Sequence, residues 1–170
     1  MKKLRMVWTV AFSLLVSIVL ITACVTIGAF STGASPDDIE IIRKYGELVG
    51  ICFQIKDDIF DYSFSPDTGK PTGGKDLQEG KITLPLIYAL SQFENIERKD
   101  VISIIQRKEF TPDNIDKILL FVHKQGGIDY AIRKMEDIKN QAIQTLNYFP
   151  KNEIRDALVL CAEFAVSRNF

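Results

Sequence analysis

The segment from Gly50 to Pro85 gathers three aspartates at the end of an apolar stretch and follows them with a glycine-rich stretch. Asp57 and Asp61 are four residues apart, so on a helix they share one face, and Asp58 lies beside them. Three carboxylates at this spacing repel one another unless a cation lies between them. Mg²⁺ suits such oxygens, because it commonly takes one or two carboxylates together with phosphate oxygens and water. The segment therefore predicts a helix that ends in a magnesium site.

Lysines follow the aspartates in a loop predicted over residues 64–81, where six glycine and proline residues interrupt any regular element. The ammonium groups of Lys70 and Lys81 are suitable partners for phosphate oxygens. Lys75 is interpreted as a solvated loop lysine. Carboxylates, a metal ion and lysines within one segment indicate a site for a diphosphate.

Composition and charge exclude several other functions. A length of 170 residues suits a single domain, and a net charge of −1 gives no basic surface for nucleic acid. His123 is the single histidine, so a histidine-based triad or a multi-histidine metal site is excluded. The three cysteines are widely spaced and form no CxxC motif, which argues against structural zinc or a disulfide framework. This cysteine usage fits a reducing compartment, and we expect a cytoplasmic protein.

The apolar spacing predicts an all-α fold. Ser35 and Pro36 begin a helix expected over residues 36–63, because serine is a good N-cap and proline suits the first helical position. No alternating apolar pattern between hairpin turns is present, so no sheet is expected. Further helices are predicted over residues 83–93, 98–108, 112–126, 128–149 and 151–168. The last helix would place Ile154, Ala157, Leu158, Cys161 and Phe164 on one face.

The N-terminal run has two interpretations. Residues 6–36 contain no charge and follow three basic residues, so the run is long enough to span or contact a membrane through residues 6–30. The segment that ends at Cys24 also resembles a bacterial lipoprotein cleavage site. The alternative is a helix buried in a large α-helical core, which would be apolar all round.

The aspartate segment resembles the second aspartate-rich region of the trans-type polyprenyl diphosphate synthases. Three motifs occur in the order and spacing of that family: Phe53-Gln54-Ile55-Lys56-Asp57-Asp58-Ile59-Phe60-Asp61, then Gly69-Lys70-Pro71, then Asp76-Leu77-x-x-Gly80-Lys81-x-Thr83-Leu84-Pro85. A DDxxD alone arises often by chance, whereas the combination is specific. The resemblance extends from about residue 20 to the C-terminus, and residues 1–19 diverge from it. It also favours the buried helix for the N-terminal run, with Cys24 buried.

The resemblance implies an activity and roles for the matching residues. These synthases condense isopentenyl diphosphate with an allylic diphosphate in isoprenoid biosynthesis and release pyrophosphate, using Mg²⁺. Asp76 would orient the lysine-bearing loop. The implied fold is an isoprenoid-synthase-type helical bundle around a deep apolar cavity. The implied assignments are metal ligation by Asp57, Asp58 and Asp61, substrate binding by Gln54, Lys70 and Lys81, and catalytic stabilisation of the leaving group by Lys70 and Lys81.

The 170 residues contain one DDxxD motif, whereas the resemblance implies two in a chain about twice as long. We therefore expect a truncated form of the fold that lacks its N-terminal half and has little or no activity alone. It would act in a homo- or hetero-oligomer formed through its helices. The alternative is a non-catalytic binding or regulatory subunit, or a gene remnant of such a synthase.

Overall fold

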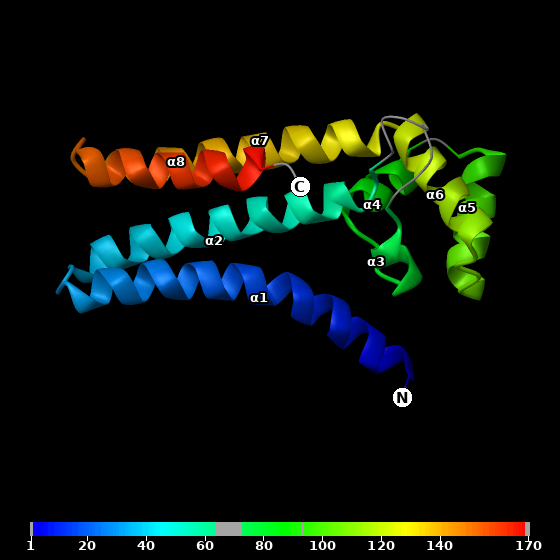
Figure 1. Cartoon of the computed structure of the whole chain (residues 1–170), viewed down its shortest axis with the longest axis horizontal. Helices are drawn as coiled ribbons and strands as arrows, with labels where there is room; N and C mark the ends of the chain where they lie inside the picture. The colour runs from blue at the N-terminus through cyan, green and yellow to red at the C-terminus, as the bar shows by residue number, and fades with distance from the viewer. Residues whose placement is uncertain (1, 64–72, 93, 169–170) are drawn as a thin grey trace. The chain divides into compact units, whose positions relative to one another are not determined.

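Helices form all the regular structure in the described part of the chain, as the sequence predicts (Figure 1). The computed structural model describes residues 2–63, 73–92 and 94–168, with side chains from residue 16 onward. The chain falls into two compact units, residues 1–56 with 134–170 (unit 1) and residues 57–133 (unit 2). That residues 1–170 form one domain stays a prediction. The elements are α1 (Lys2–Ser31), α2 (Pro36–Phe60), α3 (Lys75–Gln78), α4 (Leu84–Ser91), α5 (Ile96–Arg107), α6 (Pro112–Lys124), α7 (Gly127–Thr145), the 3₁₀ turn η1 (Leu146–Tyr148) and α8 (Glu153–Ser167).

The N-terminus of α2 confirms the predicted helix start. The Ser35 hydroxyl accepts a hydrogen bond from the Asp38 backbone N–H at 3.2 Å. The Asp38 carboxylate accepts in return from the Ser35 backbone N–H at 3.2 Å. This reciprocal arrangement satisfies two amides that the helix itself leaves without partners. The helix then continues to Phe60, three residues before the predicted end.

Unit 1 is built around α2, which contacts α1 on one side and the α7–α8 pair on the other. Its core joins Ile42, Tyr45 and Val49 of α2 to small residues of α7 and α8. The Tyr45 hydroxyl donates to the backbone carbonyl of Leu158 at 2.6 Å, which satisfies the one polar atom of this ring. These positions of α2 therefore form the buried face of the helix.

Two glycines allow α1 and α2 to lie close together. A Cβ atom at Gly50 would come within 2.7 Å of the Ile18 Cα atom. One turn earlier, a Cβ at Gly46 would lie 2.6 Å from a methyl group of Val25 and 3.0 Å from the Thr22 Cα atom. Such approaches exclude a side chain, so the spacing of these glycines determines how closely the helices pack.

The predicted helix in the N-terminal run is confirmed, but it is not buried all round. Ile21, Val25 and Ala29 pack against the core of unit 1. The opposite face is exposed, and the prediction that Cys24 is buried is wrong, because Cys24 lies on that face. From residue 16 onward, the large apolar side chains of α1 that are exposed are those of Val16, Val19, Leu20, Ile27 and Phe30. Among the described residues, no helix has the length and hydropathy needed to cross a bilayer.

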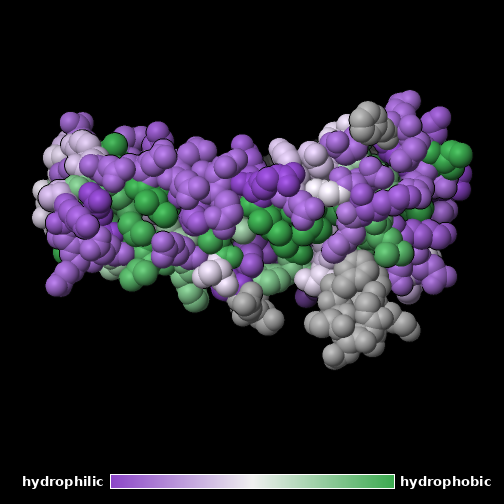
Figure 2. All heavy atoms as spheres, turned by 90° about the horizontal axis from the view of Figure 1, so that it is seen from above, coloured by the Kyte–Doolittle hydropathy of each residue, from purple (hydrophilic) through white to green (hydrophobic). Residues whose placement is uncertain are grey.

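Helix α8 packs through a face different from the apolar one that its spacing suggests. Its buried residues are the small side chains Ala162, Ala165 and Val166. Ile154 and Phe164 are 74% and 67% exposed, and Cys161 is exposed beside them. In Figure 2, hydrophobic atoms of unit 1 reach the surface among hydrophilic ones at the left of the view.

An open depression in unit 1 joins the exposed parts of α1 and α8. Its volume is about 710 Å³, and it lies between the end of α1, the start of α2 and the connection from α7 to α8. The apolar residues that line it include Val25, Ile42, Ile154 and Leu158. Part of the exposed apolar surface of unit 1 is therefore concave.

Unit 2 packs α3 to α6 around a separate core that includes Leu77, Leu86, Val101 and Ile118. Thr111 caps α6 by accepting from the Asn114 backbone N–H, as its position before Pro112 predicts. The core supports the segment that follows α2, and it thereby positions the residues described next.

Candidate diphosphate and metal site

The aspartate cluster lies at the C-terminal end of α2, as predicted. Asp58 is 5% exposed, whereas Asp57 and Asp61 are half-buried. The end of a helix carries unpaired backbone carbonyls and a partial negative charge. Carboxylates at this end of a helix are therefore unfavourable unless cations or backbone amides balance them.

The Asp61 carboxylate is engaged by backbone amides. Its Oδ1 accepts from the Lys75 N–H at 2.8 Å, and its Oδ2 accepts from the Asp76 N–H at 3.0 Å. Burial raises the pKa of Asp61, and the nearby charge of Asp76 adds to this effect, while the backbone hydrogen bonds oppose it. Asp61 thus faces the start of α3.

Lys81 is held by two carboxylates after α3. Its Nζ lies 2.8 Å from Asp76 Oδ1 and 2.8 Å from Glu79 Oε2, and its side chain is 16% exposed. Burial alone would lower the pKa of Lys81, but the hydrogen bonds and charges of Asp76 and Glu79 outweigh burial and raise it. The ammonium group is therefore charged and fixed in place. The predicted orienting role of Asp76 agrees with this contact.

Gln54 and Lys70 are the other predicted substrate residues. Gln54 is buried on α2 one turn before Asp58, and its side-chain oxygen accepts from the Ser17 hydroxyl at 3.3 Å. Ser17 was not among the predicted site residues, because a lone serine in an apolar run gives no functional signal. Lys70 lies outside the described residues. Lys75 is exposed, as its interpretation as a solvated lysine requires.

The donor chemistry of Asp57 and Asp58 fits a hard divalent ion. Within residues 16–63, 73–92 and 94–168, no three carboxylate, thiol or imidazole groups converge on one point as a complete metal site would require. Mg²⁺ needs only one or two protein carboxylates when diphosphate oxygens and water complete its shell. These two aspartates can therefore hold a metal that arrives with a diphosphate.

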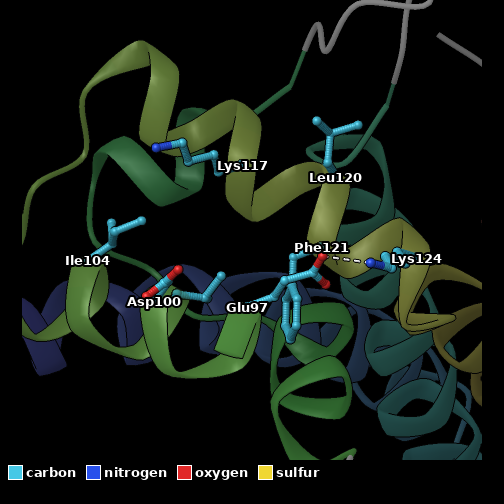
Figure 3. A pocket seen from close by; sticks show the side chains of 8 residues that line it. Glu97, Asp100, Ile104, Lys117, Leu120, Phe121 and Lys124 are labelled. Carbon is cyan, nitrogen blue, oxygen red and sulfur yellow. Dashed lines mark hydrogen bonds and ion pairs between the residues drawn. The ribbon is translucent and has the colours of Figure 1, made fainter. Parts of the chain in front are cut away.

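Unit 2 also has a depression, which has a volume of about 250 Å³ and lies between α5 and α6 (Figure 3). Lys117 and Lys124 line it together with Glu97 and Asp100. The Lys124 ammonium is 2.6 Å from Glu97, so its charge is balanced within the chain. Two carboxylates thus accompany the two ammonium groups, and this depression offers a diphosphate no excess of positive charge.

Comparison with known proteins identifies the family. The sequence profile of the Polyprenyl synthetase family matches residues 17–122. The chain belongs to the polyprenyl synthetase family. Heptaprenyl diphosphate synthase component 2 of Bacillus subtilis is 32% identical over 152 residues, which are 89% of this chain and 42% of that protein.

Solved structures of the family have the same helical fold. The geranylgeranyl pyrophosphate synthase of Bacteroides thetaiotaomicron matches with a TM-score of 0.79 and 38% identity, over 89% of this chain and 50% of that one. A polyprenyl synthase of Caulobacter crescentus, solved with calcium and isoprenyl diphosphate, matches with a TM-score of 0.77 and 34% identity, over 88% of this chain and 45% of that one. The isoprenoid-synthase-type fold is thus confirmed, and the chain spans half or less of these relatives' length.

Proposed function

We propose that this chain forms the part of a polyprenyl diphosphate synthase that holds the diphosphate of the allylic substrate. The observation that carries the proposal is the Lys81 ammonium, which Asp76 fixes a short distance along the chain from the α2 aspartates. The family match and its motif order support it. The substrates would be an allylic diphosphate and isopentenyl diphosphate, as in the family.

Each residue has a distinct part in this proposal. Asp57 and Asp58 would hold Mg²⁺, and the ion would neutralise charge on the diphosphate as the allylic C–O bond breaks. Lys81 would donate hydrogen bonds to diphosphate oxygens and stabilise the same charge. Gln54 would contact the diphosphate from the preceding turn of α2. Lys70 would contribute a second ammonium.

We further propose that the 170 residues alone do not complete the condensation and that the other half of the family fold is needed to complete the site. The one DDxxD motif at residues 57–61 supports this. The exposed apolar faces of α1 and α8 give such a chain a surface to cover, because large exposed apolar patches mark interaction sites. The relative in Bacillus subtilis is itself named as a component. A non-catalytic subunit with the same surface is the alternative.

Ligand-induced stabilisation tests the diphosphate site. Pyrophosphate with Mg²⁺ should raise the Tm of the purified chain, since a ligand that binds only the folded state stabilises it. Asp57→Asn should remove the Mg²⁺-dependent part of the shift. Asp116→Asn is the matched control, because Asp116 is an exposed carboxylate of unit 2 on α6. Absence of any shift in the wild-type chain would contradict the proposal.

A prenyl-transfer assay distinguishes the catalytic role from that of a non-catalytic subunit. The chain with Mg²⁺, isopentenyl diphosphate and an allylic diphosphate should give no detectable elongation. Elongation should appear when a fragment that carries the N-terminal half of a family synthase is added. Robust elongation by the chain alone would contradict the need for a partner. If pyrophosphate binds in a Mg²⁺-dependent way but neither condition gives elongation, the non-catalytic subunit would be favoured.

A further inference from the structure

Helix α3 has no cap of its own. Its N-cap residue is Gly74, which lacks a side chain and adopts φ +96°, so its amides receive no side-chain oxygen from the usual position. The Asp61 carboxylate supplies this function from α2, because its two oxygens accept from the first two backbone N–H groups of α3, those of Lys75 and Asp76. One carboxylate thus closes the start of a helix that lies 14 residues further along the chain.

Two glycines make this contact possible. A Cβ atom at Gly73 would lie 1.8 Å from the Asp61 carbonyl oxygen, which excludes any side chain there. At Gly74 the backbone N–H donates to the same carbonyl at 2.7 Å, and a Cβ would come within 2.4 Å of an Ile115 methyl. Asp61 therefore binds Gly74, just before α3, through its backbone carbonyl and the first two residues of α3 through its side chain.

The capped helix in turn holds Lys81. Asp76 receives the Asp61 contact at its N–H and binds the Lys81 ammonium through its carboxylate at 2.8 Å. The Asp76 carbonyl also accepts from the Lys81 backbone N–H at 2.8 Å. Three residues are thus linked in series, from α2 through α3 to the lysine.

We propose that Asp61 is a positioning residue that caps α3 and thereby holds Asp76 and Lys81 in place for the diphosphate. The inference rests on the proposed function for the role of Lys81. This role is additional to the metal ligation that the resemblance implies for Asp61, because a carboxylate oxygen that accepts one N–H keeps a lone pair for a second partner.

Pyrophosphate binding measured by calorimetry, with and without Mg²⁺, distinguishes the two roles. Asp61→Ala should weaken binding about tenfold in both conditions, since a displaced Lys81 affects the diphosphate whether or not metal is present. Asp61→Asn should restore part of the affinity, because its single amide oxygen can still accept from one of the two N–H groups, and the shorter side chain of Asp61→Ser should restore less. Asp57→Asn should remove only the Mg²⁺-dependent part. Loss restricted to the Mg²⁺ condition, and equal in all three Asp61 variants, would overturn the proposal.

Amide hydrogen exchange tests the positioning role independently of any ligand. In Asp61→Ala, exchange at the Lys75 and Asp76 amides should accelerate, and the NMR signal of the Lys81 side chain should shift. In Asp61→Asn, whose side chain keeps one acceptor oxygen, one of the two amides should exchange near its wild-type rate and the Lys81 signal should shift less than in Asp61→Ala. Unchanged exchange and an unchanged Lys81 signal in Asp61→Ala would overturn the proposal. If the wild-type chain binds no pyrophosphate while these changes occur, the proposed function fails and the positioning role stands.

Discussion

The Tyr62 hydroxyl lies 2.9 Å from the Thr83 hydroxyl oxygen, and both residues are buried. The contact joins the two ends of the segment that contains the predicted diphosphate loop, residues 64–81. On the same tyrosine, the backbone carbonyl oxygen lies 2.7 Å from His123 Nε2 of α6. Tyr62 and Thr83, which flank these residues, are therefore bound to each other, and Tyr62 is also bound to α6 of unit 2.

Removal of the Tyr62 hydroxyl tests this connection. Tyr62→Phe should lower the free energy of unfolding by about 1–3 kcal/mol, because the buried Thr83 hydroxyl loses its partner. Thr83→Val in the same chain should recover part of the loss, since no polar atom is then left unpaired. Urea unfolding of both single variants and the double variant gives the coupling energy. Additive losses would show that the two hydroxyls do not interact.

Alanine at two glycines should have opposite effects. Gly50→Ala should destabilise the chain by about 1–3 kcal/mol, because its Cβ meets the Ile18 backbone and pushes α1 away from α2. Gly28→Ala, on exposed α1, meets no atom within 4 Å and should stabilise by roughly 0.5–1 kcal/mol through helix propensity. Thermal unfolding of each variant measures the difference. Equal effects would contradict the close packing of α1 and α2.

Thiol labelling tests whether a partner covers the exposed apolar faces of α1 and α8. Cys24 on α1 and Cys161 on α8 are exposed, whereas Cys52 is buried. Iodoacetamide should therefore label Cys24 and Cys161 in the folded chain, and Cys52 only in denaturant. Addition of the complementary half of a family synthase should protect the two exposed thiols. Labelling that does not change in a complex with restored elongation would place the partner on another surface.

Alkaline pH should destabilise the chain through Cys52. Burial raises the pKa of this thiol from 9.0 to about 12, and the charge of Glu136 adds to the effect. Between these values the folded state keeps a proton that the unfolded state loses, so stability is complete below pH 9 and falls as pH rises toward 12. The loss should reach about 1 kcal/mol at pH 10. In Cys52→Ala, urea unfolding at pH 8 and pH 10 should show a smaller decrease; an equal decrease would exclude the thiol as its source.

The helix starts and the aspartate motif could be predicted because each depends on residues close together in the sequence. Ser35 and Asp38 cap α2 through contacts three residues apart, and Thr111 caps α6 in the same way, so the helix starts required no knowledge of the fold. The motif around Asp57 and Asp58 likewise occurs within a few residues. The all-α fold class and the segment that contains the candidate diphosphate site could therefore be predicted from the sequence.

Only the tertiary structure decided which helix faces are buried and which groups the Asp61 carboxylate oxygens bind. Spacing alone groups Asp61 with its neighbouring aspartates, whereas the fold directs its carboxylate to the amides of α3, because two glycines let the distant segment approach. Spacing also makes Ile154 and Phe164 part of the apolar face of α8, yet the small residues of α8 pack inward. Periodicity shows which residues share a helix face. The choice of the face that is buried depends on partners distant in sequence, and these come together only when the chain folds.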